Sequence, residues 1–142
     1  MNTSTSDKPK IIHRVVARFS DGRVLKGQQV EFSLTDSSFL LRPLGKKKPE
    51  AVDLKDLKAV YYVKSFDGRP FYRKVRGFVS PDTVGGQRVI VRFADGEELY
   101  GTTRLYSTDD PGFFVYPSDP DSNSARIFVI NGPSLAEVKF TD

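Results

Sequence analysis

The chain has 142 residues, of which 38% are hydrophobic and 28% charged, with a net charge of +4 and no cysteine. This composition is that of a small globular protein, and it excludes disulfides, thiolate metal ligands and a cysteine nucleophile. No run reaches the roughly 18 apolar residues of a membrane span, and residues 1–10 lack the apolar stretch of a signal peptide. We therefore expect a cytoplasmic protein, with residues 1–10 as a disordered tail that leads into the first strand.

An internal repeat is the strongest pattern in the sequence. Residues 14–43 align with residues 88–117 without a gap. Most of the matched positions are Arg, Phe, Gly and Pro, as in Arg14 and Arg88, Phe19 and Phe93, Gly22 and Gly96, Gly27 and Gly101, Pro43 and Pro117. The sequence therefore predicts two copies of one unit, over 11–65 and 87–142, joined by a connector over 66–86.

Alternating apolar residues between turn formers predict about five short strands in each copy and no helix. In the first copy the expected strands cover residues 14–19, 23–32, 38–42, 51–54 and 59–64. In the second copy they cover residues 88–93, 97–106, 112–116, 125–130 and 135–140. The expected fold is all-β, with two tandem, strongly bent barrels that pack together or continue one another's sheets.

Two glycines in each copy have a structural meaning. Asp-Gly at 21–22 and 95–96 lies between paired strands, and this dipeptide predicts a two-residue type I′ turn with positive φ at both central positions. Gly27 and Gly101 lie inside the longer strand, where a lone glycine indicates a bend or bulge in a sheet that curls toward closure. A close approach of the backbone to a ligand is the alternative for these two glycines.

The pattern of each copy resembles the Sm-like barrel, a small and strongly bent five-stranded sheet. In residues 89–101 a strand ends in a turn glycine, and a second glycine, Gly101, precedes an apolar run. Residues 130–138 resemble the second Sm motif, in which a strand and a glycine-containing turn lead into the last strand. The resemblance implies two fused Sm-like (or SH3-like) units, and it covers residues 87–142 and, more loosely, 12–64. The whole arrangement is also similar to a family of duplicated, uncharacterised bacterial proteins, which implies a bacterial source.

Paired arginines on the first strand of each copy form one candidate binding site. Arg14 and Arg18, repeated as Arg88 and Arg92, stand at positions of a strand that face the same way. Two guanidinium groups on one face suit bidentate recognition of phosphate. The spacing resembles the Arg-x-x-x-Arg element of PilZ domains, which implies binding of cyclic di-GMP. The alternative is an exposed strand face whose arginines are ion-paired with neighbouring residues.

The connector forms a second candidate site, because basic and aromatic residues alternate in it. Such alternation is typical of surfaces that stack bases and neutralise phosphates. The residues concerned are Arg69, Phe71, Tyr72, Arg73, Lys74 and Arg76. Packing of the aromatic rings into the junction between the two copies is the alternative.

The sequence offers no catalytic constellation. His13 is the only histidine, and without a thiol or a second imidazole neither a nucleophilic triad nor a zinc site has its parts. Residues 119–130 begin like a calcium loop but end on Ile130, where that loop requires glutamate. We therefore expect a non-enzymatic protein without a cofactor or metal, which binds a protein partner or itself through exposed strand edges. Binding of RNA or a cyclic dinucleotide through the arginines and the connector is the alternative function.

Overall fold

The computed structural model of the chain describes residues 13–31, 37–66 and 86–141. Within these ranges, ten strands form one antiparallel sheet, and the only helical segment is the 3-10 turn η1 at Leu54–Asp56. The strands are β1 (His13–Phe19), β2 (Val24–Glu31), β3 (Ser38–Pro43), β4 (Glu50–Asp53), β5 (Leu57–Val63), β6 (Gln87–Phe93), β7 (Glu98–Thr103), β8 (Gly112–Pro117), β9 (Ser124–Ile130) and β10 (Leu135–Thr141). The prediction of an all-β fold is confirmed.

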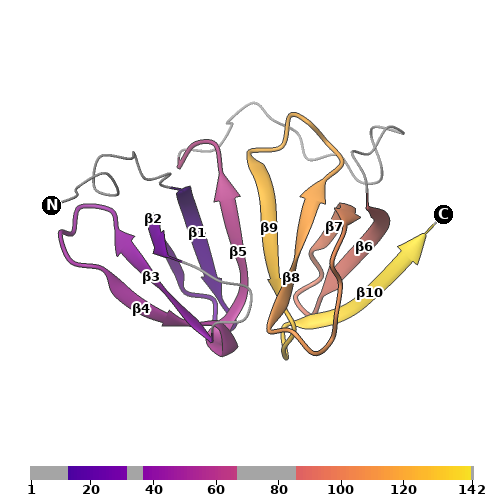
Figure 1. The fold of residues 1–142 in the computed structure, drawn as a ribbon, viewed down its shortest axis with the longest axis horizontal. Coiled ribbons are helices and arrows are strands. Elements are labelled where there is room, and N and C mark those ends of the chain that lie inside the picture. The colour runs from indigo at the N-terminus through magenta and orange to yellow at the C-terminus, as the bar shows by residue number, and fades with distance from the viewer. Residues whose placement is uncertain (1–12, 32–36, 67–85, 142) are drawn as a thin grey trace, which may run out of the picture.

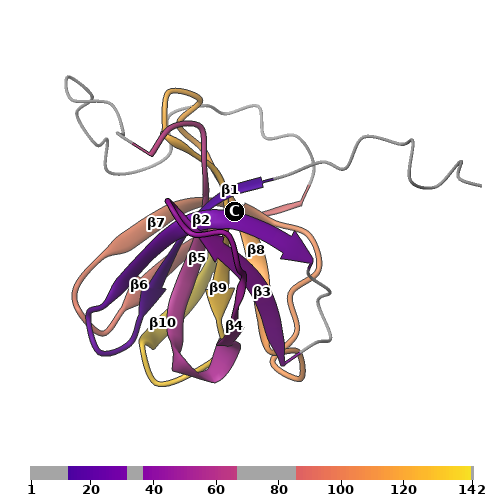
Figure 2. The same cartoon turned by 90° about the vertical axis from the view of Figure 1, so that its left-hand side faces the viewer.

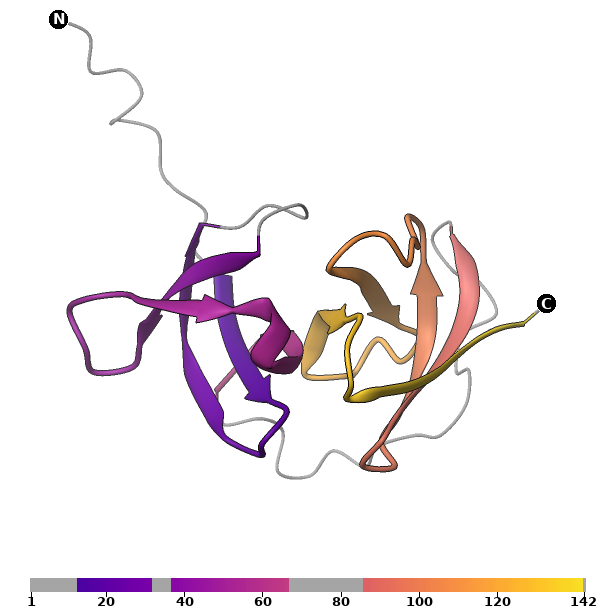
Figure 3. The ribbon, with the colours of Figure 1, turned by 90° about the horizontal axis from the view of Figure 1, so that it is seen from below.

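The strands lie across the sheet in the order β10-β6-β7-β8-β9-β5-β1-β2-β3-β4. Strands β1–β5, here called the N-terminal half, and strands β6–β10, the C-terminal half, therefore follow the same order. The halves meet where β5 pairs with β9, and Figure 1 shows these two strands side by side at the centre of the molecule. The β1–β2 and β6–β7 hairpins point the same way in Figure 2, while Figure 3 shows each half curled on its own side of the junction.

The sheet is open, with β10 and β4 at its two edges. The sequence predicts two bent barrels, and it leaves open whether they share a sheet. The structure joins the halves into one sheet, because β5 is paired on one side with β1 and on the other with β9. A strand has two edges for backbone pairing, so β5 has none left to close the N-terminal half against β4.

Two hydrophobic clusters lie on opposite faces of the β5–β9 pair, and each one takes side chains from both halves. The first cluster lies mainly in the N-terminal half but includes Phe128 and Ile130 of β9. The second cluster lies mainly in the C-terminal half but includes Ala59 and Tyr61 of β5 and Val16 of β1. Neither half therefore has a complete core of its own.

The turn of the β1–β2 hairpin differs from the predicted type I′ turn. The Gly22 N–H donates to the Phe19 carbonyl over 3.0 Å, and the Phe19 N–H donates to the Arg23 carbonyl over 2.9 Å. Gly22 has a φ of 98°, and no other residue type in the described ranges has a positive φ. Asp21 closes the turn with its carboxylate, which accepts the Arg23 N–H over 3.0 Å. The same contacts recur over residues 93–97, so the type I′ prediction is wrong in both hairpins.

Gly27 and Gly101 lie where their strands run close to the backbone of the next strand of the sheet. A Cβ atom at Gly27 would overlap the carbonyl oxygen of Arg42 on β3. At Gly101 it would overlap the carbonyl oxygen of Tyr116 on β8. The close backbone approach at these glycines is therefore to a neighbouring strand.

Gly101→Ala should lower the free energy of unfolding by about 1–3 kcal/mol, because β8 must move to relieve the overlap. Urea unfolding followed by circular dichroism should show a lower midpoint with an unchanged slope. Gly132→Ala is the matched control, since its Cβ would meet only the Ile130 side chain at an ordinary 3.6 Å. Equal midpoints for the two variants would contradict this account of Gly101.

Candidate functional site

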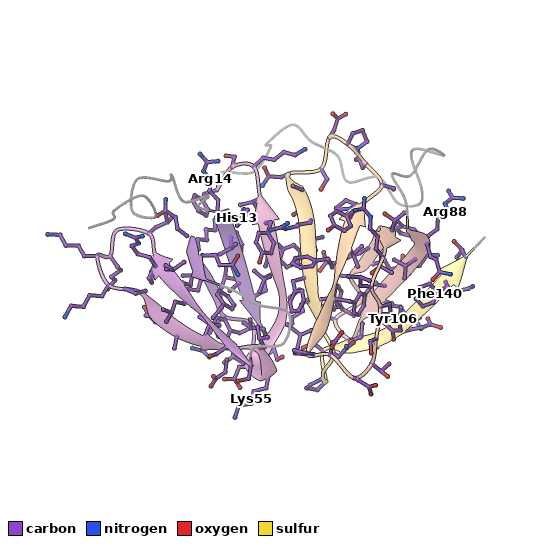
Figure 4. The ribbon with its side chains drawn as sticks, in the orientation of Figure 1. His13, Arg14, Lys55, Arg88, Tyr106 and Phe140 are labelled. Atoms are coloured by element: carbon purple, nitrogen blue, oxygen red, sulfur yellow. The ribbon has the colours of Figure 1, made fainter. Side chains whose placement is uncertain are left out.

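The arginines singled out in the sequence do not form one site. Arg14 and Arg18 lie on β1 in the N-terminal half, whereas Arg88 and Arg92 lie on β6 in the C-terminal half. Figure 4 shows Arg14 and Arg88 in different parts of the molecule, with side chains that do not point toward one another. Each pair must therefore be considered separately.

The arginines also differ in their partners. Arg92 forms an ion pair with Glu137, with 2.7 Å between Nη2 and Oε1, which is the alternative that the sequence left open. Arg14 donates a 3.4 Å hydrogen bond to the carbonyl oxygen of Lys64. Arg18 lies over the ring of Tyr61, with its guanidinium carbon 5.5 Å from the ring centre. Among the contacts of the described residues, Arg18 has no hydrogen bond or ion pair.

The candidate residues of the connector lie outside the described residues. They are Arg69, Phe71, Tyr72, Arg73, Lys74 and Arg76. The expected tail over residues 1–10 lies outside them as well.

A buried lysine at the junction is the main feature that the sequence analysis missed. Lys58 lies on β5, is only 9% exposed, and has its Nζ 2.6 Å from Asp95 Oδ2 and 2.6 Å from Glu97 Oε1. Its ammonium group also lies 4.5 Å from the centre of the Phe93 ring. Tyr61 donates its hydroxyl hydrogen to the same Glu97 oxygen over 2.8 Å. These contacts tie β5 of the N-terminal half to the β6–β7 hairpin of the C-terminal half.

Two pKa values in this cluster are shifted by neighbouring groups, those of the Asp95 carboxyl and the Tyr61 hydroxyl. The Lys58 ammonium holds the pKa of the Asp95 carboxyl below its usual range, and the Glu97 backbone N–H adds to this effect. Burial raises the pKa of the Tyr61 hydroxyl, and the Glu97 carboxylate raises it further. At neutral pH Tyr61 is thus a neutral donor and the Asp95 carboxylate is charged, so charged hydrogen bonds link the two halves.

Lys58→Met should lower the free energy of unfolding at neutral pH by about 1–3 kcal/mol, because Asp95 and Glu97 lose a charged hydrogen-bond partner. Urea unfolding measures this loss. Lys55→Met is the matched control, since Lys55 lies on η1 with its side chain pointing away from the molecule in Figure 4. A loss at Lys58 no larger than at Lys55 would show that the buried cluster contributes nothing to stability.

The low pKa of Asp95 should also make stability sensitive to acid. Its carboxyl has a pKa of about 4 in the unfolded chain and a lower one in the folded protein. Its contribution to the free energy of unfolding is therefore present above about pH 4 and lost as the pH falls through the folded pKa. Since Lys58→Met removes the main cause of the shift, the variant should lose less stability than the wild type between about pH 5 and pH 2. Urea titrations across this range with equal acid slopes would refute the coupling.

The free edge of β10 is the second feature of the site. β10 pairs with β6 just as β5 pairs with β1, and both pairings contain a register shift at the equivalent place. β5 accepts β9 on its other side, whereas the corresponding side of β10 has no partner strand within the described residues. Phe140 of β10 is 39% exposed and packs edge-on against Tyr106, with 5.2 Å between ring centres (Figure 4).

The opposite edge, β4, is less open to another strand. It is short, at Glu50–Asp53, and Pro49 and the lysines of Lys46–Lys48 precede it. Short length, proline and lysine are features that protect an edge from pairing. In the register that β5 and β9 use, β4 of a second copy would place Val52 opposite the charged Glu137 and Glu50 opposite Lys139. Because β4 is short and follows proline and lysine, the β10 edge is the better acceptor for a strand.

A groove between the halves is the third feature, with a volume of about 530 Å³. Its floor is apolar and comes from both halves: Val16, Tyr61, Leu99, Val115 and Ile127. Arg18 and Lys26 line it from the N-terminal half, and polar residues of β7 and of the β8–β9 loop line it from the C-terminal half.

The fold and these surfaces define an all-β protein built on one open antiparallel sheet. Across the described ranges, no group of three or more His, Cys, Asp or Glu residues could hold a metal ion. The chain belongs to the family of unknown function DUF6982, whose model matches residues 11–140. Searches of curated proteins and of solved structures gave no match. No helix in the described part of the chain is long and apolar enough to cross a membrane.

Proposed function

We propose that this protein is a non-catalytic binding protein that recognises a protein partner by adding one of the partner's strands to the free edge of β10. The β5–β9 pairing is the observation that carries the proposal, because in it the equivalent edge accepts an antiparallel strand. Addition of a strand to an exposed edge is a general mode of peptide recognition, in which backbone hydrogen bonds supply affinity and alternate side chains supply specificity.

The same proposal accounts for the repeat. Both halves have the same strand order and the same register shift, which supports the interpretation of the chain as two fused Sm-like units. In such a pair, one unit uses its last strand to hold the other unit, and the last strand of the second unit stays available. Among the described strands, the free edge of a last strand at β10 is then a consequence of fusing two copies.

The side chains of β10 specify what the incoming strand should carry. Glu137 and Lys139 point to one face of the sheet, while Val138 and Phe140 point to the other. Opposite charges across a strand pair stabilise it and like charges destabilise it. A strand antiparallel to β10 meets Phe140 first, so it should read apolar, acidic, apolar, basic.

A labelled peptide Val-Glu-Val-Lys-Val should therefore bind about 5-fold more tightly than Val-Lys-Val-Glu-Val, because reversal places like charges opposite Glu137 and Lys139. Fluorescence anisotropy measures both affinities. Lys139→Glu should abolish the preference, since each peptide then makes one favourable and one unfavourable pair. Lys55→Glu makes the same change of charge on η1, outside β10, and should keep the preference. Equal affinity of the wild type for the two peptides would refute recognition at β10.

Binding of RNA or a cyclic dinucleotide is the second candidate function, and the exposed Arg14 and Arg18 on β1 favour it. Salt separates the two candidates, because phosphate contacts weaken steeply as salt rises. Labelled single-stranded RNA and cyclic di-GMP are therefore titrated at low and at moderate salt. Salt-sensitive binding that is lost in Arg14→Ala/Arg18→Ala, together with no binding of either peptide, would replace strand addition by this function.

A further inference from the structure

The groove between the halves is lined by both carboxylates and cations, and these two groups differ in how many hydrogen bonds and ion pairs they make within the protein. Its carboxylates accept hydrogen bonds from within the protein: Glu97 from Lys58 and Tyr61, Glu98 from the Tyr100 hydroxyl over 3.0 Å, and Asp119 from the Asp121 N–H over 2.9 Å. Three cations line the groove: Arg18, Lys26 and Lys58. Of these, Lys58 is already paired with the carboxylates of Asp95 and Glu97.

The two other cations of the groove are not held in this way. Arg18 contacts the Tyr61 ring but has no ion pair or hydrogen bond among the described residues. Within the same described residues, Lys26 donates one hydrogen bond, over 3.3 Å, to the carbonyl oxygen of Phe66. A guanidinium group has several N–H donors in a planar fork that matches carboxylate, sulfonate and phosphate. One wall of the groove therefore offers an anion site.

The equivalent position in the C-terminal half shows why Arg18 lacks a partner. Arg18 faces Ala59 across the β1–β5 pair, whereas Arg92 faces Glu137 across the β6–β10 pair. Arg92 forms its ion pair with that glutamate. In the N-terminal half the small Ala59 supplies no carboxylate, so Arg18 forms no ion pair across the strands and lines the groove instead.

We infer that the groove binds a small aromatic anion, with its anionic group on Arg18 and Lys26 and its ring on the apolar floor. Phe66 and Tyr100, which are both partly exposed, line the groove and offer flat apolar surface. A volume of about 530 Å³ is in the range of small-molecule sites, which bury an apolar body and fix it with a few polar groups. This site is distinct from the edge of β10, and neither requires the other.

The probe for this site is 8-anilinonaphthalene-1-sulfonate, an aromatic sulfonate whose fluorescence rises in apolar surroundings. One molecule should bind per chain, and Arg18→Ala should weaken it about 10-fold by removing a charged hydrogen-bond partner. The neutral N-phenyl-1-naphthylamine should bind the wild type and Arg18→Ala equally. Arg92→Ala is the matched control, because it removes the repeat-equivalent arginine outside the groove, and it should leave the sulfonate affinity unchanged.

Two further experiments test where the probe binds and which anionic group the site prefers. Ser122→Trp places a bulky ring in the groove and should abolish binding of both probes, while its urea midpoint reports that the protein is folded. Displacement of the sulfonate by adenosine monophosphate or by 1-naphthoate would support the site and distinguish a phosphate from a carboxylate ligand. Equal sulfonate affinity in the wild type and Arg18→Ala, or displacement by neither competitor, would overturn the inference.

Discussion

The pairing of β5 with β9 is the interaction on which the rest of the structure depends. Residues 57–62 of β5 are all buried, because alternate side chains enter the two hydrophobic clusters on opposite faces of the sheet. Val60 and Tyr62 enter the first cluster, while Ala59 and Tyr61 enter the second. Separation of the halves would expose both clusters at once, and units of this size have little core to lose. Each half therefore depends on the other to complete its core.

The same constraint explains the difference between the inner strands and the edges. Where β5 has Ala59 and Tyr61, its counterpart β10 has Glu137 and Lys139. These charges face solvent at no cost, but next to an apolar strand they would lose hydration. An edge of this kind resists indiscriminate pairing and still accepts a strand whose charges are complementary. In the proposed function, selectivity at β10 would thus come from residues that would be unfavourable at the junction.

Local pattern was sufficient to predict all ten strands, because alternation and turn residues act over a few positions. The hairpin turn was mispredicted because the Asp21 carboxylate supplies a hydrogen bond that the dipeptide rule does not consider. The junction depends on pairing between distant segments, yet it left a signal: residues 57–63 are nearly all apolar, as in a strand buried on both faces, whereas 135–141 alternate. Lys58 interrupts that run, and only the fold brings Asp95 to it.

The groove follows from the junction as well. Burial of β5 against β9 requires small or apolar side chains on the face that meets the C-terminal half, and Ala59 satisfies this requirement. A glutamate at that position would pair with Arg18 but would place a charge inside the second cluster, at a cost of several kcal/mol. Ala59 thus completes the second cluster, and Arg18 at the rim of the groove is left without a carboxylate partner among the described residues. A ligand that supplies the missing anion would contact both halves, so its binding would stabilise the junction that created its site.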